Sequence, residues 1–154
     1  MESKQYNVPE LIVGGIAADD RGMLRFINGF DFVECGIRRF YQVENHEADF
    51  IRAWHGHHNE AKYVYVASGA AVVGCFPMNQ QSWNPSDIDS HRFVLTGTTP
   101  KLLFIPKGWY NGFKTLTPDT KTFFFSTTTL EESKGDDFRL EHDYLPDFWK
   151  VEYR

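Results

Sequence analysis

Short apolar runs, separated by glycine, proline and polar turns, recur along this 154-residue chain. In several runs apolar and polar residues alternate, which is the pattern of a strand with one buried face. The pattern predicts strands at 11–16, 23–32, 37–43, 63–66, 70–76, 93–96, 101–105, 111–116 and 121–127, and a further extended segment at 52–57.

The polar segments between these runs predict the connections. Asp19–Gly22 has the composition of a turn, and Asn28–Gly29 is a hairpin signal inside the run at 23–32. Residues 78–92 are expected to form a long surface loop. Only the tail from Leu130 has a helix-like composition, and within it residues 131–137 are expected to be a charged turn.

Strands at short, regular spacing with almost no helical periodicity predict an all-β fold, a double-sheet barrel of the jelly-roll type. An aromatic content of 16% suits pleated surfaces. The length predicts a single domain over residues 1–154. Within it, residues 1–10 are expected to be irregular, and residues 130–154 to form a C-terminal tail that packs on the barrel.

Charge and cysteine content narrow the function classes. A formal net charge of −5 argues against a general nucleic-acid binder, since such a surface needs an excess of lysine and arginine. Cys35 and Cys75 have no spacing motif and are expected to be buried thiols in a reducing compartment. The sequence shows neither a signal-peptide pattern nor an apolar run of about 18 residues. We therefore expect a soluble, cytoplasmic protein without a membrane partner.

The candidate chemistry lies between Ile51 and Gly69, where histidines and a lysine precede an apolar run. If residues 52–57 are extended, His55 and His57 share one face and Trp54 points to the other. Two imidazoles on one side of a sheet, with Lys62 nearby, suit proton transfer or metal binding.

Metal binding can be judged by comparing the chain with the motifs of metal-binding cupins, a jelly-roll family. Those motifs are His-x-His followed by Glu, and Pro-x-Gly-x-x-His. Counting back from Gly69, Lys62 stands at the Glu position and Glu60 is two residues out of register, while Asn111 replaces the last histidine. Since a lysine would repel a metal cation, the sequence predicts no metal and no cofactor.

With these departures, the chain resembles the metal-free cupins of the dTDP-4-dehydrorhamnose 3,5-epimerase family. The resemblance covers roughly residues 19–143 and rests on the order and spacing of several pieces. These are Asp20-Arg21-Gly22, Phe40-Tyr-Gln-Val-Glu-Asn45-His, Ile51-Arg52-x-x-His55, Lys62 with Gly69, Ile105-Pro106-x-Gly108-x-x-Asn111-Gly112-Phe113, and Phe125-Ser-Thr-Thr. It implies a cupin-type jelly-roll homodimer with exchanged N-terminal strands, acting on nucleotide-linked 4-keto-6-deoxy sugars.

The resemblance also implies roles for individual residues. His55 falls on the catalytic base, Lys62 on the active-site lysine and Arg52 on an active-site arginine. Asp143 best matches the carboxylate that orients the histidine, with Glu141 as a rival. The chemistry fits, because removing a proton next to a ketone needs a base that titrates near neutrality and a cation beside the enolate.

Further residues are candidates for substrate binding. Arginines bind diphosphate oxygens in a bidentate way, and aromatic side chains can form the walls of a base or sugar pocket. The candidates are Arg21, Arg38 and Arg39 for a diphosphate, Trp83, Trp109 and Tyr110 for the walls, and Asn111 within its motif.

Three departures from the family pattern bear on the reaction. Leu130 stands where the catalytic tyrosine is expected, Pro77 replaces an aspartate, and Asn111 replaces a histidine. Loss of the tyrosine leaves two alternatives to epimerisation open. One is a sugar-nucleotide 3,4-ketoisomerase, whose Arg-Gly-Gly-His-x-His motif resembles residues 52–57 and in which His57 would relay the proton. The other is a silent sugar-nucleotide-binding cupin. The resemblance further suggests a role in surface-polysaccharide precursor synthesis.

Overall fold

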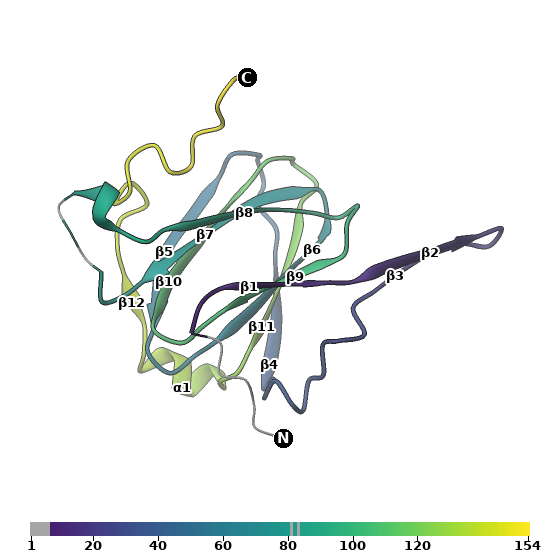
Figure 1. The fold of residues 1–154 in the computed structure, drawn as a ribbon. Helices are drawn as coiled ribbons and strands as arrows, with labels where there is room; N and C mark the ends of the chain where they lie inside the picture. The colour runs from purple at the N-terminus through teal and green to yellow at the C-terminus, as the bar shows by residue number, and fades with distance from the viewer. Residues whose placement is uncertain (1–6, 81, 83) are drawn as a thin grey trace.

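Two five-stranded antiparallel sheets face each other in the computed structural model, which describes residues 7–80, 82 and 84–154 (Figure 1). The first sheet has the order β1 (Glu10–Val13), β9 (Lys101–Ile105), β6 (Lys62–Ser68), β11 (Lys121–Ser126) and β4 (Arg39–Val43). The second has the order β12 (Phe138–Arg139), β5 (Ile51–His57), β10 (Trp109–Thr115), β7 (Ala70–Pro77) and β8 (His91–Thr96). This architecture confirms the predicted all-β jelly roll.

The main core fills the space between the two sheets. Alternation along each strand directs one set of apolar side chains inward, as expected for packed sheets. The fully buried members include Val64, Val73, Leu95 and Leu103, and Phe124 is 4% exposed.

A second apolar cluster lies on the outer face of the second sheet, where the C-terminal tail packs. Leu145 and Trp149 of the tail are buried against Trp54 of β5 and Phe76 of β7. The rings of Trp54 and Trp149 lie 4.9 Å apart between centroids. The tail therefore covers a sheet face that would otherwise expose tryptophan and phenylalanine to water.

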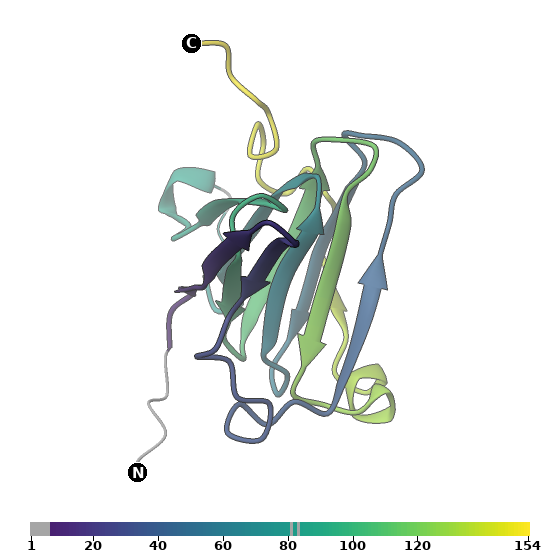
Figure 2. The same ribbon diagram turned by 90° about the vertical axis from the view of Figure 1, so that its right-hand side faces the viewer.

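The outer face of the first sheet carries a group of partly exposed aromatic side chains. We call it the outer aromatic face, and it comprises Phe30, Phe32, Phe40, Phe123 and Phe125. Figure 2 shows the sheet from the side of β4 and β11. Phe32 is 53% and Phe40 64% exposed, so this face is only partly covered by the protein's own chain.

A separate hairpin, formed by β2 (Gly15–Asp19) and β3 (Gly22–Phe26), projects away from the barrel (Figure 1). Its turn is the predicted one at Asp19–Gly22, where Gly22 has a φ of 143° that favours glycine. The prediction of a hairpin at Asn28–Gly29 is wrong. These residues form a turn, but β3 has already ended at Phe26, and the next strand, β4, belongs to the first sheet.

The tail contains a short helix, α1 (Leu130–Lys134), where the sequence analysis predicted a charged turn. The side chain of Thr129 accepts a hydrogen bond from the backbone N–H of Glu132, and its hydroxyl donates to the Glu132 carboxylate. This reciprocal cap stabilises the first turn of a helix. The acidic run is therefore helical at its start, and the missed signal was threonine three residues before glutamate.

The segment at 78–92 differs from a plain surface loop. It contains a 3₁₀ turn, η1 (Pro85–Asp87), and its last two residues belong to β8. Ile88 is 6% exposed and joins the second apolar cluster, which ties the segment to the barrel. Among the described residues no helix is both long and apolar enough to cross a membrane.

Candidate active site

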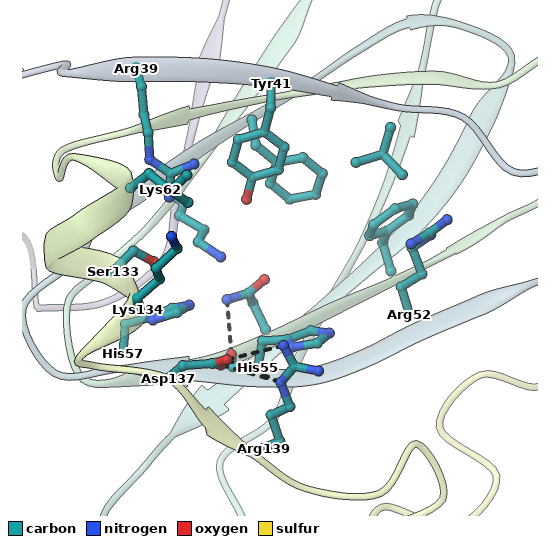
Figure 3. Close-up of a pocket in the computed structure, with 15 residues that line it drawn as sticks. Arg39, Tyr41, Arg52, His55, His57, Lys62, Ser133, Lys134, Asp137 and Arg139 are labelled. Carbon is teal, nitrogen blue, oxygen red and sulfur yellow. Dashed lines mark hydrogen bonds and ion pairs between the residues drawn. The ribbon is translucent and has the colours of Figure 1, made fainter.

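A cavity of about 380 Å³ opens at one end of the barrel, between β4, β6 and β11 on one wall and β5 and β10 on the other (Figure 3). Helix α1 and strand β12 close its side. Its volume falls in the range of small-molecule sites. The lining side chains are mostly cationic or aromatic, and a single carboxylate, that of Asp137, is among them.

His55 and His57 of β5 both line this cavity, and Trp54, the residue before His55, points into the second apolar cluster. The shared face follows from the strand alternation that the sequence predicted. Asn111 of β10 pairs with His55 in the strand register, and its amide Nδ2 donates to the carbonyl oxygen of His55 at 3.1 Å. The backbone that carries His55 is thus held from the neighbouring strand.

Arg52 reaches the same cavity although strict alternation would place it on the opposite face from His55. The register between β5 and β10 shifts between Asn111 and Phe113, which pair with His55 and Arg52 respectively. Such an irregularity redirects a side chain from one face to the other. The Arg52 guanidinium then donates from Nε to the side-chain oxygen of Asn45 at 2.7 Å, which fixes it at the mouth.

Lys62, the first residue of β6, lies on the facing wall and is 7% exposed. Its Nζ lies 6.0 Å from the ring centroid of Phe124. Burial lowers the pKa of Lys62, and the carboxylate of Glu60 counteracts this by favouring the charged form. A lysine held in this way places a positive charge in a partly dehydrated site, where it acts strongly on a bound ligand.

The imidazole of His55 is neutral at physiological pH. Burial, with the positive charge of Lys62 as the second cause, lowers the pKa of His55 to about 4. Burial and Lys62 also lower the pKa of His57, while Glu60 acts to raise it. Neutral imidazoles are proton acceptors, so the wall formed by β5 can receive protons. The pKa of His55 nevertheless lies below the near-neutral value that the sequence analysis expected of the base, because the site is buried and holds Lys62.

Asp137 is the carboxylate that the structure brings to the cavity, and neither Asp143 nor Glu141 lines it. Arg139 donates from Nη2 to Asp137 at 3.0 Å, and this hydrogen bond lowers the pKa of Asp137 (Figure 3). Asp143 lies on an exposed turn beyond β12. The pairing of Arg139 with His55 in the register of β12 and β5 explains the difference, because it brings residues just before position 139 to the site.

Four of the predicted binding residues lie away from this cavity. Tyr110 is buried in the second apolar cluster, with its ring centroid 5.2 Å from that of Phe76. Arg21 is at the tip of the projecting hairpin, where its guanidinium binds Asp19 at 2.5 Å. Arg38 is exposed and lies 3.8 Å from Glu132. Trp109 is buried between the sheets, with its ring centroid 5.4 Å from that of His91. Trp83 lies outside the described residues.

Arg39, a candidate for diphosphate binding, does line the cavity, together with residues that the sequence analysis did not assign to a site. The polar ones are Tyr41, Ser133, Lys134, Asp137 and Arg139. Arg39 and Tyr41 are two apart on β4, so a strand predicted there implied a shared face. Which face of β4 meets the cavity depends on the pairing of distant strands. Leu130, the residue at the expected tyrosine position, also lines the cavity and is 54% exposed.

In the described part of the chain, no three His, Cys, Asp or Glu side chains are grouped closely enough to hold a metal ion. Lys62 and Asn111, which replace the ligands of a metal-binding cupin, both line the cavity with His55 and His57.

A jelly roll with paired histidines and a lysine between its two sheets defines the class of the protein as a cupin. The chain belongs to the dTDP-4-dehydrorhamnose 3,5-epimerase family, whose profile matches residues 10–145. This match confirms the resemblance seen in the sequence and the predicted class, an epimerase or isomerase of nucleotide-linked sugars. No curated protein sequence matches the chain.

Solved structures with the same fold include epimerases and a ketoisomerase. The dTDP-4-dehydrorhamnose 3,5-epimerase of Bacillus anthracis, with TDP and PPi bound, is 21% identical, with 86% of this chain and 78% of that one covered and a TM-score of 0.71. That of Elizabethkingia anophelis is 14% identical, with 95% and 83% covered and a TM-score of 0.75. The sugar 3,4-ketoisomerase QdtA of Thermoanaerobacterium thermosaccharolyticum, in complex with TDP, is 16% identical, with 92% and 94% covered and a TM-score of 0.67.

Proposed function

We propose that this protein is an isomerase that acts on a nucleotide-linked 4-keto-6-deoxy sugar by removing a proton next to the ketone, with epimerisation at carbon 3, at carbon 5 or at both as its main reaction. The observation that carries the proposal is the neutral imidazole of His55 facing the buried lysine Lys62 across one cavity. A base and a cation are what enolate formation requires, since the enolate oxygen develops negative charge.

The charge of the cavity supports an anionic substrate. Its cationic side chains come from five different elements and are Arg39, Arg52, Lys62, Lys134 and Arg139. The one carboxylate among the lining side chains is already bound to Arg139. Guanidinium groups bind diphosphate oxygens in a bidentate way, so a nucleoside diphosphate is the carrier group that this cavity favours.

In the proposed reaction, the imidazole of His55 takes a proton from the carbon next to the ketone. The electron pair of the broken C–H bond moves onto the ketone oxygen, and Lys62 stabilises the resulting enolate. A proton returned to the opposite face of that carbon inverts the centre. Tyr41 on the facing wall is the proposed donor, because burial, followed by the charge of Glu60, raises the pKa of its hydroxyl and keeps it protonated.

A 3,4-ketoisomerase is the second candidate. His57 lies beside His55 on the same wall, and Leu130 offers no proton where the family tyrosine is expected. In this reaction a proton moves between adjacent carbons on one face through an enediol. The two candidates thus use different partners for His55, namely Tyr41 across the cavity or His57 beside it.

Proton NMR in deuterated water tests the proposed function. The purified protein is incubated with dTDP-4-keto-6-deoxyglucose and with related nucleotide sugars. Deuterium at carbon 3 or carbon 5 with inversion supports the epimerase, and transfer of the keto group from carbon 4 to carbon 3 supports the ketoisomerase. Binding without exchange or rearrangement would identify a silent sugar-nucleotide-binding cupin and contradict the proposal.

The pH dependence of exchange follows from the low pKa of His55. Only the neutral imidazole accepts a proton, and that form is lost as the pH falls through a pKa of about 4. We therefore expect kcat/KM to stay level through pH 6.5, where an unperturbed histidine titrates. A pH profile of the exchange rate measures this directly. An acidic limb centred near 6.5 would contradict a buried, neutral base.

The dimer implied by the sequence resemblance is also part of the proposal. The hairpin exposes the apolar side chains of Ile16, Met23 and Leu24 at 47%, 55% and 64%. A projecting apolar hairpin beside the outer aromatic face suits pairing with a second copy. In such a dimer Arg21, at the tip of the hairpin, would serve the partner's cavity.

Leu24→Arg is expected to weaken this dimer, because it places a charge on an apolar surface that a second copy would bury. Sedimentation equilibrium should show a dimer for the wild type and a shift toward the monomer for the variant. Val94→Arg is the matched control, since Val94 is 51% exposed on β8 of the other sheet. A wild type that is monomeric at all concentrations would contradict the proposed dimer.

We also propose that the protein works in the cytoplasm, in the synthesis of activated sugars for polysaccharide. Cys75 is buried and Cys35 partly buried, and both are free thiols. Burial raises the pKa of the Cys75 thiol, which disfavours its reactive thiolate. Free thiols of this kind suit a reducing compartment.

A further inference from the structure

A carboxylate is sealed behind the cavity, where it joins four elements of the structure. The side chain of Glu60, between β5 and β6, has no exposed surface. Its Oε1 accepts hydrogen bonds from Ser126 of β11 at 2.5 Å and from Arg39 of β4 at 3.2 Å. Its Oε2 accepts one from Ser133 of α1 at 3.0 Å and lies 3.3 Å from Nδ1 of His57.

Three of these four partners also line the cavity, whereas Glu60 itself does not. Arg39, His57 and Ser133 come from different parts of the chain and meet at this carboxylate. A buried charge is costly unless it is paired and hydrogen-bonded, and Glu60 satisfies both conditions. The network therefore connects the two walls and the closing helix at one buried point.

The network also determines which ring nitrogen of His57 carries the hydrogen. Its Nδ1 faces two acceptors, the carbonyl oxygen of Asp136 and the carboxylate of Glu60. In the neutral ring Nδ1 must therefore carry the hydrogen, which leaves Nε2 as the acceptor. The carboxylate of Asp136 accepts from the backbone N–H groups of His58 and Asn59 at 2.9 and 2.7 Å, which holds this carbonyl in place.

The charge of Glu60 acts on Lys62 and on His57. Burial would raise the pKa of Glu60, but Lys62, Ser126 and His57 outweigh it, so its pKa lies below the ordinary value and the group is ionised. That negative charge raises the pKa of Lys62 and of His57 against the effect of burial.

We propose that Glu60 is a positioning residue of the active site, which holds Arg39 and His57 at the cavity wall. For His57 the inference rests on the proposed function, because it assigns Glu60 a purpose through a residue that acts on the sugar. Neither the family motif nor the metal-cupin motif assigns a role to this position, and in the latter Glu60 is out of register.

The test follows His57 by ¹⁵N NMR in the ligand-free protein. The charged and titratable groups near His57 are Glu60 on its own connection, Lys62 on β6, Asp137 beyond α1 and the neighbouring His55. In Glu60→Gln we expect the pKa of His57 to fall by about one unit, because one opposite charge within hydrogen-bond reach is lost. Glu44→Gln, the same change at an exposed position, is the matched control and should leave this pKa unchanged.

The wild-type spectrum keeps the proposal testable if Glu60→Gln does not fold. It should show neutral His57 with its hydrogen on Nδ1, and a hydrogen on Nε2 would overturn the proposal. An unchanged His57 pKa in a folded Glu60→Gln protein would overturn it as well.

Turnover supplies a second readout for the effect on Lys62. In Glu60→Gln the alkaline limb of the exchange profile should move to lower pH, because the pKa of Lys62 falls. A residue with only a structural role would lower exchange equally at every pH, and that result would overturn the effect on Lys62. The NMR result needs no substrate, so a protein without exchange would refute the proposed function and leave the role of Glu60 toward His57 to be decided separately.

Discussion

Replacing His55 by asparagine is expected to reduce deuterium exchange into the sugar by about 10³-fold, in the range usual for loss of a general base. Asparagine is polar and of similar size, but it cannot accept a proton from carbon. The bond from Asn111 goes to the main-chain carbonyl of residue 55 and would persist, so the strand should keep its geometry. Exchange rates at carbon 3 and carbon 5, measured by proton NMR, quantify the loss.

Two companion variants make this result specific. His46 is exposed on the connection between β4 and β5, and His46→Asn should exchange at the wild-type rate. His57→Asn separates the two candidate reactions, since it should block movement of the keto group but leave epimerisation through Tyr41. If His57→Asn abolishes all exchange while His55→Asn does not, the base would be His57. Calorimetry with dTDP should show that each variant still binds the nucleotide.

Replacing Lys62 by methionine is expected to reduce exchange by about 10²- to 10³-fold, the range found when a group that stabilises a developing anion is removed. Methionine retains the unbranched apolar stem, and therefore the packing against Phe124. The enolate would form without a cation beside its oxygen. The single-turnover exchange rate at saturating substrate isolates this effect from binding.

Lys121→Met on the neighbouring strand β11 is the control for Lys62→Met, because Lys121 is exposed and does not line the cavity. Thermal unfolding of both variants checks the fold. Arg39 remains next to Glu60 when Lys62 is lost, so the buried carboxylate keeps one cationic partner. A folded Lys62→Met protein with the wild-type exchange rate would remove Lys62 from the mechanism.

The sequence predicted the jelly roll and the shared face of His55 and His57, because both depend on local periodicity. Arg52 shows the limit of that reasoning. Its place in the cavity depends on a shift in register between β5 and β10, and nothing in the residues of β5 alone signals that irregularity. The resemblance to a family, not the strand pattern, placed Arg52 at the site.

The carboxylate near the histidines was harder to predict. Asp143 was the best match by position in the tail, yet β12 brings Asp137 to the cavity. A two-residue strand carries no periodic pattern, so its pairing with β5 cannot be read from the chain. Glu60 was missed for a different reason, since a lone glutamate before a strand shows its partners only when four distant elements are packed around it.

Trp54 and His55 are neighbours on β5 that point to opposite faces of the sheet, so Trp54 links the C-terminal tail to the cavity wall that carries His55. Its ring is fully buried between β5 and the tail residues Phe148 and Trp149, while no residue beyond Arg139 lines the cavity. A smaller ring at Phe148 or Trp149 is therefore expected to loosen the strand from behind and to lower turnover. Substitutions in the tail would then change turnover without altering any group that touches the substrate.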